Sequence, residues 1–443
     1  MKSERGPLVF IASSVTGKRW RGLWAILTAY IVLSPFVYNL TEFSDFRIPS
    51  NTDGHENDIK NDPLNHQRTN QSEVESLVRS LPIWLQDYIE FHRKTVQNLN
   101  KRSWISKRYL IVRCYYYDKC GGTSDRIKGI PLLLLLAAKS NRTLFIRWTR
   151  PYPLEEFMLP VTINWTVPDW MTTILDRKSS GYSRKLATGL SELENVVTSY
   201  DYTIVEARVQ MADGGGARYQ NLTGGVRNDY GPDYHSIFRA VFQPSPPIAK
   251  AISRFYEENG LLPGRYAVAH QRARYARRGI DYPPPKIMAE AVNAVNCASR
   301  LLPGAPIFFA SDSVAGYSAV RDYAKEYNRS IVTRDDTSER PLHLEFGHRM
   351  NIKNPPPPSQ YYATFIDLWI MGNGRCVAFG PGGFGHWGLV MGFNVSCAYN
   401  YRKPRSCNWM EGNTKSNVVS ANILSNYVKN SSAHLKAGAL LPA

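Results

Sequence analysis

The chain has 443 residues, of which 43% are hydrophobic and 12% aromatic, so it is too long and too apolar for a disordered segment or one small domain. Its 31 glycines and 28 prolines are near average usage and show no period, which excludes collagen-like, low-complexity and repeat architectures. The formal charge of +17 favours an anionic partner, whether a phosphate, a polyanionic sugar, a nucleic acid or a membrane surface.

The N-terminal region predicts a membrane anchor. Positions 22–41 contain no charged residue, and a helix of this length spans the apolar core of a bilayer. Lysine or arginine stands before this segment at positions 18, 19 and 21, and acidic residues follow at 42 and 45, so the positive-inside rule puts the tail 1–21 in the cytosol. The sequence therefore predicts a single-pass type II protein whose remaining residues are lumenal. A cleaved signal peptide is the alternative, and it leads to the same compartment.

Two further features fit a lumenal chain. Acceptor motifs for N-glycosylation, Asn-x-Ser/Thr, begin at Asn39, Asn70, Asn141, Asn164, Asn221, Asn328, Asn394 and Asn430. Six cysteines are present without the paired spacing of a zinc site, and an even number is compatible with disulfides. The short separations predict the pairs Cys114/Cys120 and Cys397/Cys407. Cys297 and Cys376 either pair with each other or are small buried hydrophobic residues.

Beyond the anchor, composition and hydrophobic periodicity divide the chain. Residues 42–103 form a polar stem that ends in a helix around 83–97, where Trp84, Tyr88 and Phe91 make an apolar stripe. Two alternations of strand and helix follow, over residues 104–250 and 251–420, before a C-terminal tail, 421–443. The boundary is expected near 244–260, where prolines interrupt the pattern.

The two alternations predict the fold class. In the first, a buried strand at 109–112 leads through a glycine turn to an apolar helix that ends at 138 and a strand at 144–146. In the second, strands are expected at 266–270, 307–310, 331–332 and 376–379, and helices at 286–301, 314–327 and 361–371. Successive βαβ units build parallel sheets with ligand sites at the carboxyl ends of the strands. We therefore predict an α/β protein with two Rossmann-like domains facing a cleft.

Three segments at predicted strand ends carry residues suited to chemistry. Residues 121–126, Gly-Gly-Thr-Ser-Asp-Arg, place glycines before a helix whose N–H groups attract an anion. Residues 270–274, His-Gln-Arg-Ala-Arg, hold guanidinium groups that can bind a diphosphate. Residues 379–387, Phe-Gly-Pro-Gly-Gly-Phe-Gly-His-Trp, form another glycine-rich turn. The alternative for each segment is a structural turn or a solvated basic loop.

These segments, together with Phe-Ala-Ser-Asp at 309–312, resemble in their order the fucosyltransferase superfamily. This superfamily includes protein O-fucosyltransferases, core α1,6-fucosyltransferases and bacterial nodulation fucosyltransferases, and the resemblance covers roughly residues 109–400. It implies a GT-B-like fold behind a type II Golgi (or endoplasmic reticulum) anchor. It also implies inverting, metal-independent transfer of fucose from GDP-fucose to a hydroxyl of a glycan or glycoprotein.

The resemblance implies particular site residues. Arg272 would bind the β-phosphate as the main catalytic residue, with His270 beside it, and Asp125 would be a second catalytic residue at the reacting centre. Asp312 would contact the nucleoside. The other implied donor-binding residues are Gly121, Gly122, Arg126, Gly382, Gly383, Phe384 and Gly385. This chain departs from the pattern at Ala273, where core α1,6 enzymes have a second arginine, and at the Gly382–Gly383 step, where serine is common.

Transfer of a sugar from a nucleoside diphosphate requires positive charge near the departing diphosphate. The chain contains no Asp-x-Asp motif for a divalent metal, so we expect no metal or other cofactor. Arg272 and helix N-termini would supply the charge. Asp125, Glu155 and Glu156 are candidate bases for the acceptor hydroxyl.

Two other functions stay open. The chain could be a catalytically inactive lumenal carbohydrate-binding or scaffold protein on the same fold, because a fold does not prove activity. It could also be a sulfotransferase, although the second strand-helix alternation would then be superfluous. Nucleic-acid binding is not expected, because the predicted topology puts the basic residues in the lumen.

Overall fold

The computed structural model describes residues 71–115, 117–176, 182–212, 215–223, 233–273, 284–334, 342–344, 356–391 and 397–401. The predicted cytosolic tail, membrane anchor and C-terminal tail, residues 42–70 of the stem, and Cys407 lie outside these residues. Within the part of the chain that is described, no helix has both the length and the apolar character needed to cross a membrane.

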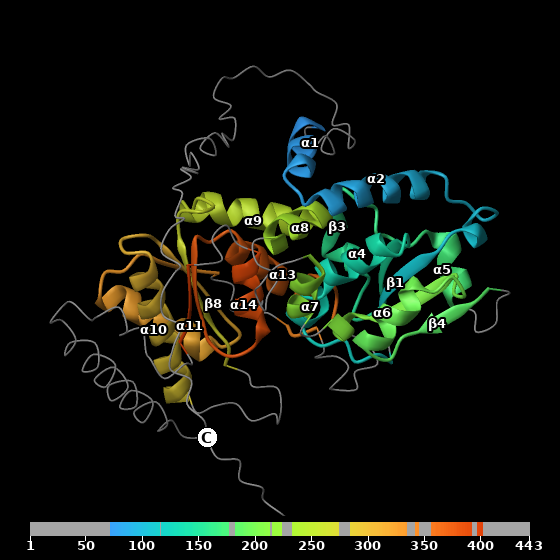
Figure 1. Cartoon of the computed structure of the whole chain (residues 1–443). Coiled ribbons are helices and arrows are strands. Elements are labelled where there is room, and N and C mark those ends of the chain that lie inside the picture. The colour runs from blue at the N-terminus through green and yellow to red at the C-terminus, as the bar shows by residue number, and fades with distance from the viewer. Residues whose placement is uncertain are drawn as a thin grey trace, which may run out of the picture. The chain divides into compact units, whose positions relative to one another are not determined.

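The first sheet has four parallel strands in the order β2-β1-β5-β4. Its strands are β1 (Tyr109–Cys114), β2 (Thr143–Trp148), β4 (Arg184–Leu186) and β5 (Ile204–Arg208). The connection from β1 to β2 runs through α3 (Thr123–Ile127) and α4 (Ile130–Lys139). Residues 130–137 of α4, IPLLLLLA, are all buried. The apolar surface of this helix therefore packs against one face of the sheet. In Figure 1, α4 lies on one side of β1 and α5 (Asp169–Asp176) lies on the other. Helix α6 (Leu190–Thr198) contacts α4.

The second sheet has five parallel strands in the order β11-β10-β7-β8-β9. Its strands are β7 (Ala267–Gln271), β8 (Ile307–Ser311), β9 (Ile331–Thr333), β10 (Cys376–Phe379) and β11 (Ala398–Asn400). The helices associated with it are α10 (Pro284–Leu301), α11 (Val314–Glu326), α13 (Ser359–Gly372) and α14 (Gly383–Val390). Every residue of β7, β8 and β10 is buried, as expected of central strands covered on both faces.

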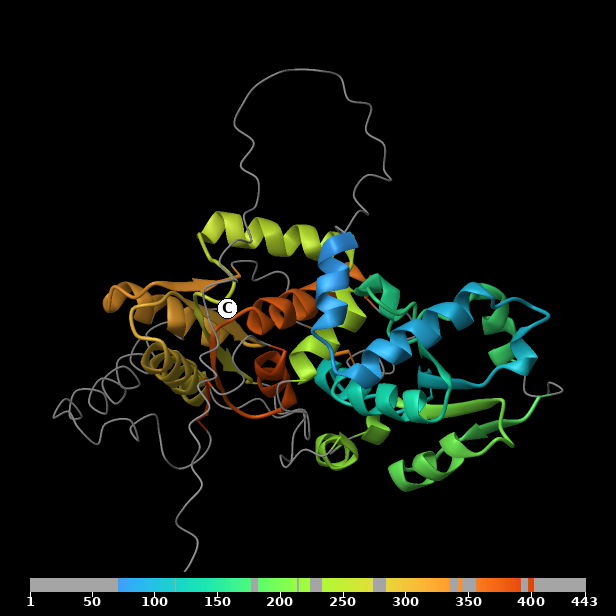
Figure 2. The ribbon, with the colours of Figure 1, turned by 45° about the horizontal axis from the view of Figure 1, so that its top comes forward.

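The remaining elements precede or connect the sheets. They are α1 (Gln71–Arg79), α2 (Ile83–Gln97), η2 (Trp104–Ser106), η3 (Leu154–Glu156), β3 (Met158–Pro160), η4 (Val209–Ala212), α7 (Gly215–Thr223), α8 (Asp233–Val241), β6 (Phe242–Pro244) and α9 (Pro246–Asn259). Strands β3 and β6 form a separate antiparallel pair. Helix α2 packs along α4, which Figure 1 and Figure 2 show from two directions.

The predicted α/β class and the parallel sheets are confirmed, and most predicted elements lie within a few residues of their observed bounds. The stretch 244–260, where the boundary between the two alternations is predicted, contains the helix α9. Pro246 and Pro247 stand in its first turn, where a missing N–H breaks no helical hydrogen bond. These prolines therefore begin a helix.

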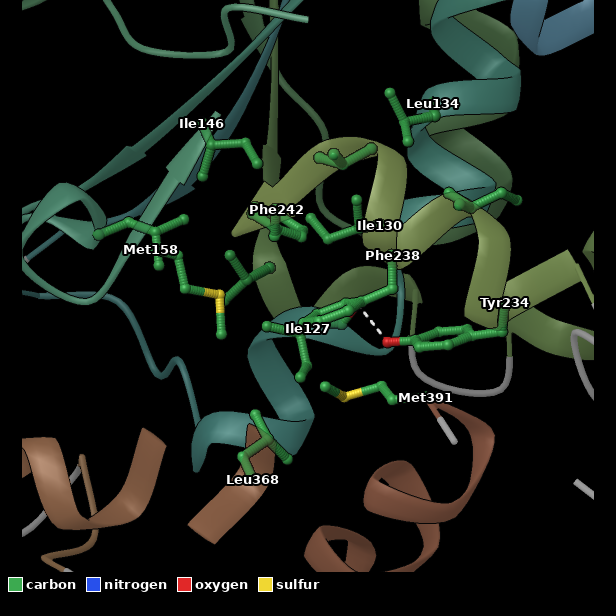
Figure 3. Close-up of a cluster of buried hydrophobic side chains, with 14 of the residues drawn as sticks. Ile127, Ile130, Leu134, Ile146, Met158, Tyr234, Phe238, Phe242, Leu368 and Met391 are labelled. Atoms are coloured by element: carbon green, nitrogen blue, oxygen red, sulfur yellow. Dashed lines mark hydrogen bonds between the residues drawn. The ribbon is translucent and has the colours of Figure 1, made fainter. Parts of the chain in front are cut away.

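One apolar core extends through both strand-helix alternations. Figure 3 shows part of it, where Ile127, Ile146 and Phe238 from the first alternation pack near Leu368 and Met391 from the second. Aromatic contacts add to this packing. The rings of Phe157 and Phe365 stack with centroids 4.4 Å apart, those of Tyr234 and Trp387 lie 5.0 Å apart, and those of Phe238 and Trp369 lie 5.1 Å apart. The two sheets are thus joined by buried hydrophobic contacts.

The disulfides partly correct the predicted pairing. Cys114 is bonded to Cys120, as predicted. Cys397 is bonded to Cys376 and not to Cys407, because Cys376 begins β10 and Cys397 directly precedes β11, its parallel neighbour. The N–H of Val377 donates to the Cys397 carbonyl at 3.0 Å. Cys297 is also disulfide-bonded, so neither it nor Cys376 is merely a small buried hydrophobic residue.

Candidate functional site

The carboxyl ends of the central strands of the second sheet bring three predicted segments together. β7 ends at Gln271, β8 at Ser311 and β10 at Phe379, and β7 pairs in parallel with both of the others. Arg272, Asp312 and the glycine-rich turn before α14 therefore follow neighbouring strands. This is the edge at which open α/β sheets bind ligands.

Arg272 lies against the glycine-rich turn. A Cβ placed on Gly382 would stand 3.1 Å from Arg272 Cδ and 3.8 Å from its Nε. Gly382 has a φ of +89°, which is readily adopted only by glycine. The turn therefore brings its backbone onto the arginine side chain immediately before the first residue of α14. A guanidinium and the start of a helix, both positive, are placed next to each other here.

Asp312 holds the main chain that carries Arg272. Its Oδ1 accepts a hydrogen bond of 2.6 Å from the N–H of Ala273. Beneath it, the hydroxyl of Ser311 donates to Gln271 Oε1 at 2.6 Å, and both of these side chains are buried. The predicted contact of Asp312 with a nucleoside is not tested by this arrangement. The observed bond shows that Asp312 fixes the position of the segment after β7.

His270 is a buried, neutral part of the same edge. Burial, together with the charge of Arg272, lowers the pKa of His270 to about 3. Its ring lies 5.5 Å from that of Phe384, and a Cβ on Gly385 would stand 2.6 Å from His270 Nδ1. Gly385 is therefore required to leave space for the imidazole. His270 supports the glycine-rich turn, and its imidazole ring is neutral at physiological pH.

The first sheet reaches this edge through α3. A Cβ on Gly383 would stand 2.9 Å from Ser124 Oγ, so the start of α14 touches the first turn of α3. Gly122, which precedes α3, is covered by His343, whose Nε2 would lie 2.8 Å from a Cβ there. The structure thus brings residues 121–126 beside the Gly382–Gly383 step. Ser124 and His343 are additional residues that sequence reasoning missed.

The carboxylate of Asp125 is already engaged within its own helix. Its Oδ2 accepts from the N–H of Gly122 at 3.0 Å, and Oδ1 lies 3.2 Å from Lys128 Nζ. The first contact caps the N-terminus of α3. Gly121 is held as well, since Gln210 can accept from its N–H at 2.9 Å when the amide is oriented to donate to the Lys119 carbonyl. Asp125 therefore caps α3, and its role at a reacting centre stays a prediction.

Arg126 does not extend toward an open surface. It is fully buried, and its guanidinium donates to the carbonyls of Gly121, Arg150 and Leu344. It also lies over the ring of Trp148. Three of its five N–H donors are thus used by main-chain carbonyls, which gives Arg126 a structural role, and its donor-binding role stays a prediction. Arg126 ties the α3 turn to residue 344 of the second alternation.

The described residues can therefore bind an anion between Arg272 and the start of α14. This site combines the positive side chain of Arg272, the start of α14 and the approach of the α3 turn, on a frame held by Asp312, Gln271 and His270. Such groups are arranged before a ligand arrives and favour negative charge.

No protein-family model and no curated protein matches the sequence. Among solved structures, the chain is similar to a mutant of Arabidopsis thaliana FUT1 in complex with GDP, with 11% identity and a TM-score of 0.48 over 70% of this chain and 77% of that one. It is also similar to POFUT1 in complex with GDP (13% identity, TM-score 0.36, 66% of this chain and 98% of that one). POFUT1 in complex with GDP-fucose gives 12% identity and a TM-score of 0.35 over 66% and 97% of the two chains.

Proposed function

We propose that the chain is a metal-independent, inverting fucosyltransferase of GT-B type that transfers fucose from GDP-fucose to a hydroxyl of a glycan or glycoprotein. The observation that carries this proposal is the placement of Arg272 against Gly382 at the start of α14. The guanidinium of Arg272 and the N–H groups at the start of α14 lie where segment 270–274 meets segment 379–387. The GDP-sugar donor is taken from the motif resemblance.

The proposed step follows from the charge that develops. The bond between the anomeric carbon and the β-phosphate oxygen breaks, and its electron pair goes to GDP. The acceptor oxygen bonds to the opposite face of the sugar and transfers its proton to a carboxylate base. Arg272 stabilises the diphosphate more strongly as its charge grows, which is the interaction that lowers a barrier. We expect this to proceed without a divalent ion, because the chain lacks Asp-x-Asp.

We assign Asp125 a positioning role within this mechanism. Its contacts with the Gly122 N–H and Lys128 Nζ hold the α3 turn. Glu155 is the other carboxylate whose surroundings fit proton transfer, since burial raises its pKa above the ordinary value. A raised pKa brings a carboxylate closer to the pH at which it can exchange protons. Glu156, the third candidate, is exposed.

The proposed location is the lumen of the Golgi or endoplasmic reticulum, behind a type II anchor. The four described glycosylation motifs are compatible with this location, because Asn141, Asn164, Asn221 and Asn328 are all exposed. Digestion of the cell-derived protein with an N-glycosidase should increase its electrophoretic mobility. An unchanged mobility would argue against lumenal residence.

The test is a donor panel. The purified full-length chain is incubated with GDP-fucose, GDP-mannose and UDP-sugars, with and without EDTA, and release of the free nucleotide is measured. We expect selective hydrolysis of GDP-fucose that EDTA does not reduce. Hydrolysis of a UDP-sugar, or loss of activity that Mn²⁺ restores, would contradict the proposal.

An inactive carbohydrate-binding protein is the second candidate, and the capping role of Asp125 favours it, because a carboxylate held by two partners is a poor base. The same panel separates the two functions. Glycan binding with no hydrolysis of any nucleotide sugar would support the binding protein.

A further inference from the structure

A second site lies at the carboxyl edge of the first sheet. A pocket of about 500 Å³ is lined there by residues 117–119 after β1, by Thr188 after β4, and by Arg208 and Gln210 at the end of β5. The Cys114–Cys120 disulfide closes the loop that forms one wall. Among these side chains, Gln210 is the one that also contacts the proposed donor site, through the N–H of Gly121. Pockets at this edge of a parallel sheet are common ligand sites.

The wall of the pocket carries excess positive charge. Beneath it, two buried carboxylates, Asp118 and Glu206, are contacted by three guanidiniums. Arg113 lies 2.9 Å from Asp118 and 3.0 Å from Glu206, Arg184 lies 2.6 Å from Glu206, and Arg208 lies 3.2 Å from Asp118. Burial alone would raise the pKa of Asp118, but its hydrogen bonds with Arg113 and the Tyr115 N–H hold that pKa below the ordinary value. The two carboxylates therefore neutralise two of the three guanidiniums, and one positive charge is left over.

Two cations face the open side. The side chain of Arg208 keeps 44% of its surface exposed although its Nε contacts Asp118, and Lys119 is exposed. Glu192, beside Thr188, is the nearby acid, and it is paired with Lys185 at 2.8 Å. The pocket therefore favours an anionic group, and a guanidinium together with an ammonium suits a carboxylate.

An aromatic side chain completes the pocket. Tyr117 is 91% exposed, which is unusual for a large side chain with an apolar ring. A flat ring with a polar tip at the mouth of a charged pocket provides a surface for the apolar face of a sugar ring and a hydroxyl for its polar edge.

The pocket is connected to the proposed donor site by a short stretch of chain. Lys119 lies three residues before Gly122, at most about 11 Å of extended backbone, and Gln210 contacts both Lys119 and Gly121. Ser124, two residues further on, touches Gly383 of the donor turn. A sugar chain held in the pocket would be within reach of the reacting centre.

We propose that this pocket binds the acceptor, and that the acceptor is a glycan with a carboxylate-bearing (uronic acid) residue. The proposal rests on the proposed fucosyltransferase function and names its acceptor class. Tyr117 contacts the sugar ring, while Lys119 and Arg208 bind its carboxylate.

The test measures binding of a galacturonic acid hexasaccharide, of the same chain with its carboxyl groups reduced, and of a sulfated form of the reduced chain. The variants Tyr117→Ala and Lys119→Gln are compared with Tyr200→Ala and Lys107→Gln, which alter exposed side chains at the opposite edge of the same sheet. Donor hydrolysis without acceptor is measured for all four variants of the full-length chain.

We expect the acidic chain to bind the unsubstituted protein about tenfold more tightly than the reduced chain, and each pocket variant to lose roughly five- to tenfold in that affinity, as charge-assisted and aromatic contacts typically contribute. The two controls and donor hydrolysis should be unchanged. Equal binding of the acidic and reduced chains, a preference for the sulfated chain, or equal losses in the controls would overturn the proposal. Failure of donor hydrolysis with normal binding of the acidic chain would instead contradict the proposed function and leave the pocket in place.

Discussion

Arg272 lies against the backbone of Gly382, so that a single added carbon at position 382 would approach Arg272 Cδ to 3.1 Å. The two residues come from different strand ends, one after β7 and the other after β10. Their contact means that the position of the guanidinium depends on the shape of the glycine-rich turn. The proposed mechanism can therefore be tested by substitution of either residue.

The first prediction concerns the charge of Arg272. Arg272→Ala should reduce donor turnover by about a hundred- to a thousandfold, or about 2.7–4 kcal/mol, with a smaller effect on GDP affinity, because the interaction grows in the transition state. Arg272→Lys should restore little, since it lacks the planar pair of donors. The control is Arg375→Ala, an exposed arginine at the amino end of β10. Equally small effects at 272 and 375 would refute the catalytic assignment.

The second prediction concerns Gly382. Gly382→Ala should lower donor turnover by displacing Arg272, and it should also reduce the free energy of unfolding by about 1–2 kcal/mol because of its positive φ. Gly304→Ala is a matched control, since Gly304 has a φ of +79° with no atom within 4 Å of an added Cβ. Both variants should lose similar stability. If turnover falls equally in both, the contact with Arg272 is not the cause.

The third prediction separates the charge of Asp312 from its hydrogen bond. Asp312→Ala removes the acceptor for the Ala273 N–H, and an unpaired N–H of this kind costs about 1–3 kcal/mol. Asp312→Asn keeps an oxygen in the same place, so it should retain most of the donor affinity that Asp312→Ala loses. Titration with GDP measures both. Equal losses would show that the negative charge itself contacts the donor.

The fourth prediction is a loss of stability in mild acid. Burial lowers the pKa of His92 to about 4 and that of His235 to about 4, and burial with the charge of Arg272 lowers that of His270 to about 3. Unfolded histidines titrate near 6.5, so the unfolded state binds protons that the folded state does not. The free energy of unfolding should therefore fall as the pH drops from about 6.5 toward 4.

Three such histidines give a slope of up to about 4 kcal/mol per pH unit. Urea unfolding at pH 7.5, 6.5 and 5.5 measures it, in a range where carboxylates contribute little. His92→Gln should remove about a third of the slope. A free energy that stays constant between pH 7 and 5.5 would show that these rings are protonated in the folded state.

The fifth prediction concerns the cysteines. Peptide mapping without reduction should recover Cys376 joined to Cys397 and Cys114 joined to Cys120. Cys376→Ser should lower the free energy of unfolding by about 3 kcal/mol, the usual effect of opening a loop of this length. A peptide that joins Cys397 to Cys407 would contradict the observed pairing.

Local patterns predicted the elements well and predicted long-range partners poorly. The helical spacing of Trp84, Tyr88 and Phe91 predicted the helix α2, although the residues that it buries are Leu85, Tyr88, Ile89 and His92. The burial of Arg126 could not be predicted in this way, since its carbonyl partners include Leu344, more than two hundred residues away. The bond from Cys376 to Cys397 likewise depends on the pairing of β10 with β11.

The candidate site shows the same division. The motifs assigned both glycine-rich segments to a ligand, and they did not indicate that Ser124 would lie against Gly383. The structure gives Gly385 a different task, since it leaves room for His270. Tyr117 and Arg208 were missed because nothing in a linear sequence marks an exposed tyrosine as the wall of a pocket.

The continuous apolar core between the two sheets also determines how the chain can be divided. A fragment ending near residue 250 would expose the surface of Phe157 and Phe238 that Phe365 and Trp369 now cover, so neither half should be soluble when it is expressed alone. Heating should give one cooperative transition for residues 71–401, because the halves cannot melt independently. Exchange of one half with that of another protein of similar fold would have to preserve these aromatic contacts, whatever ligand the chimera is designed to bind.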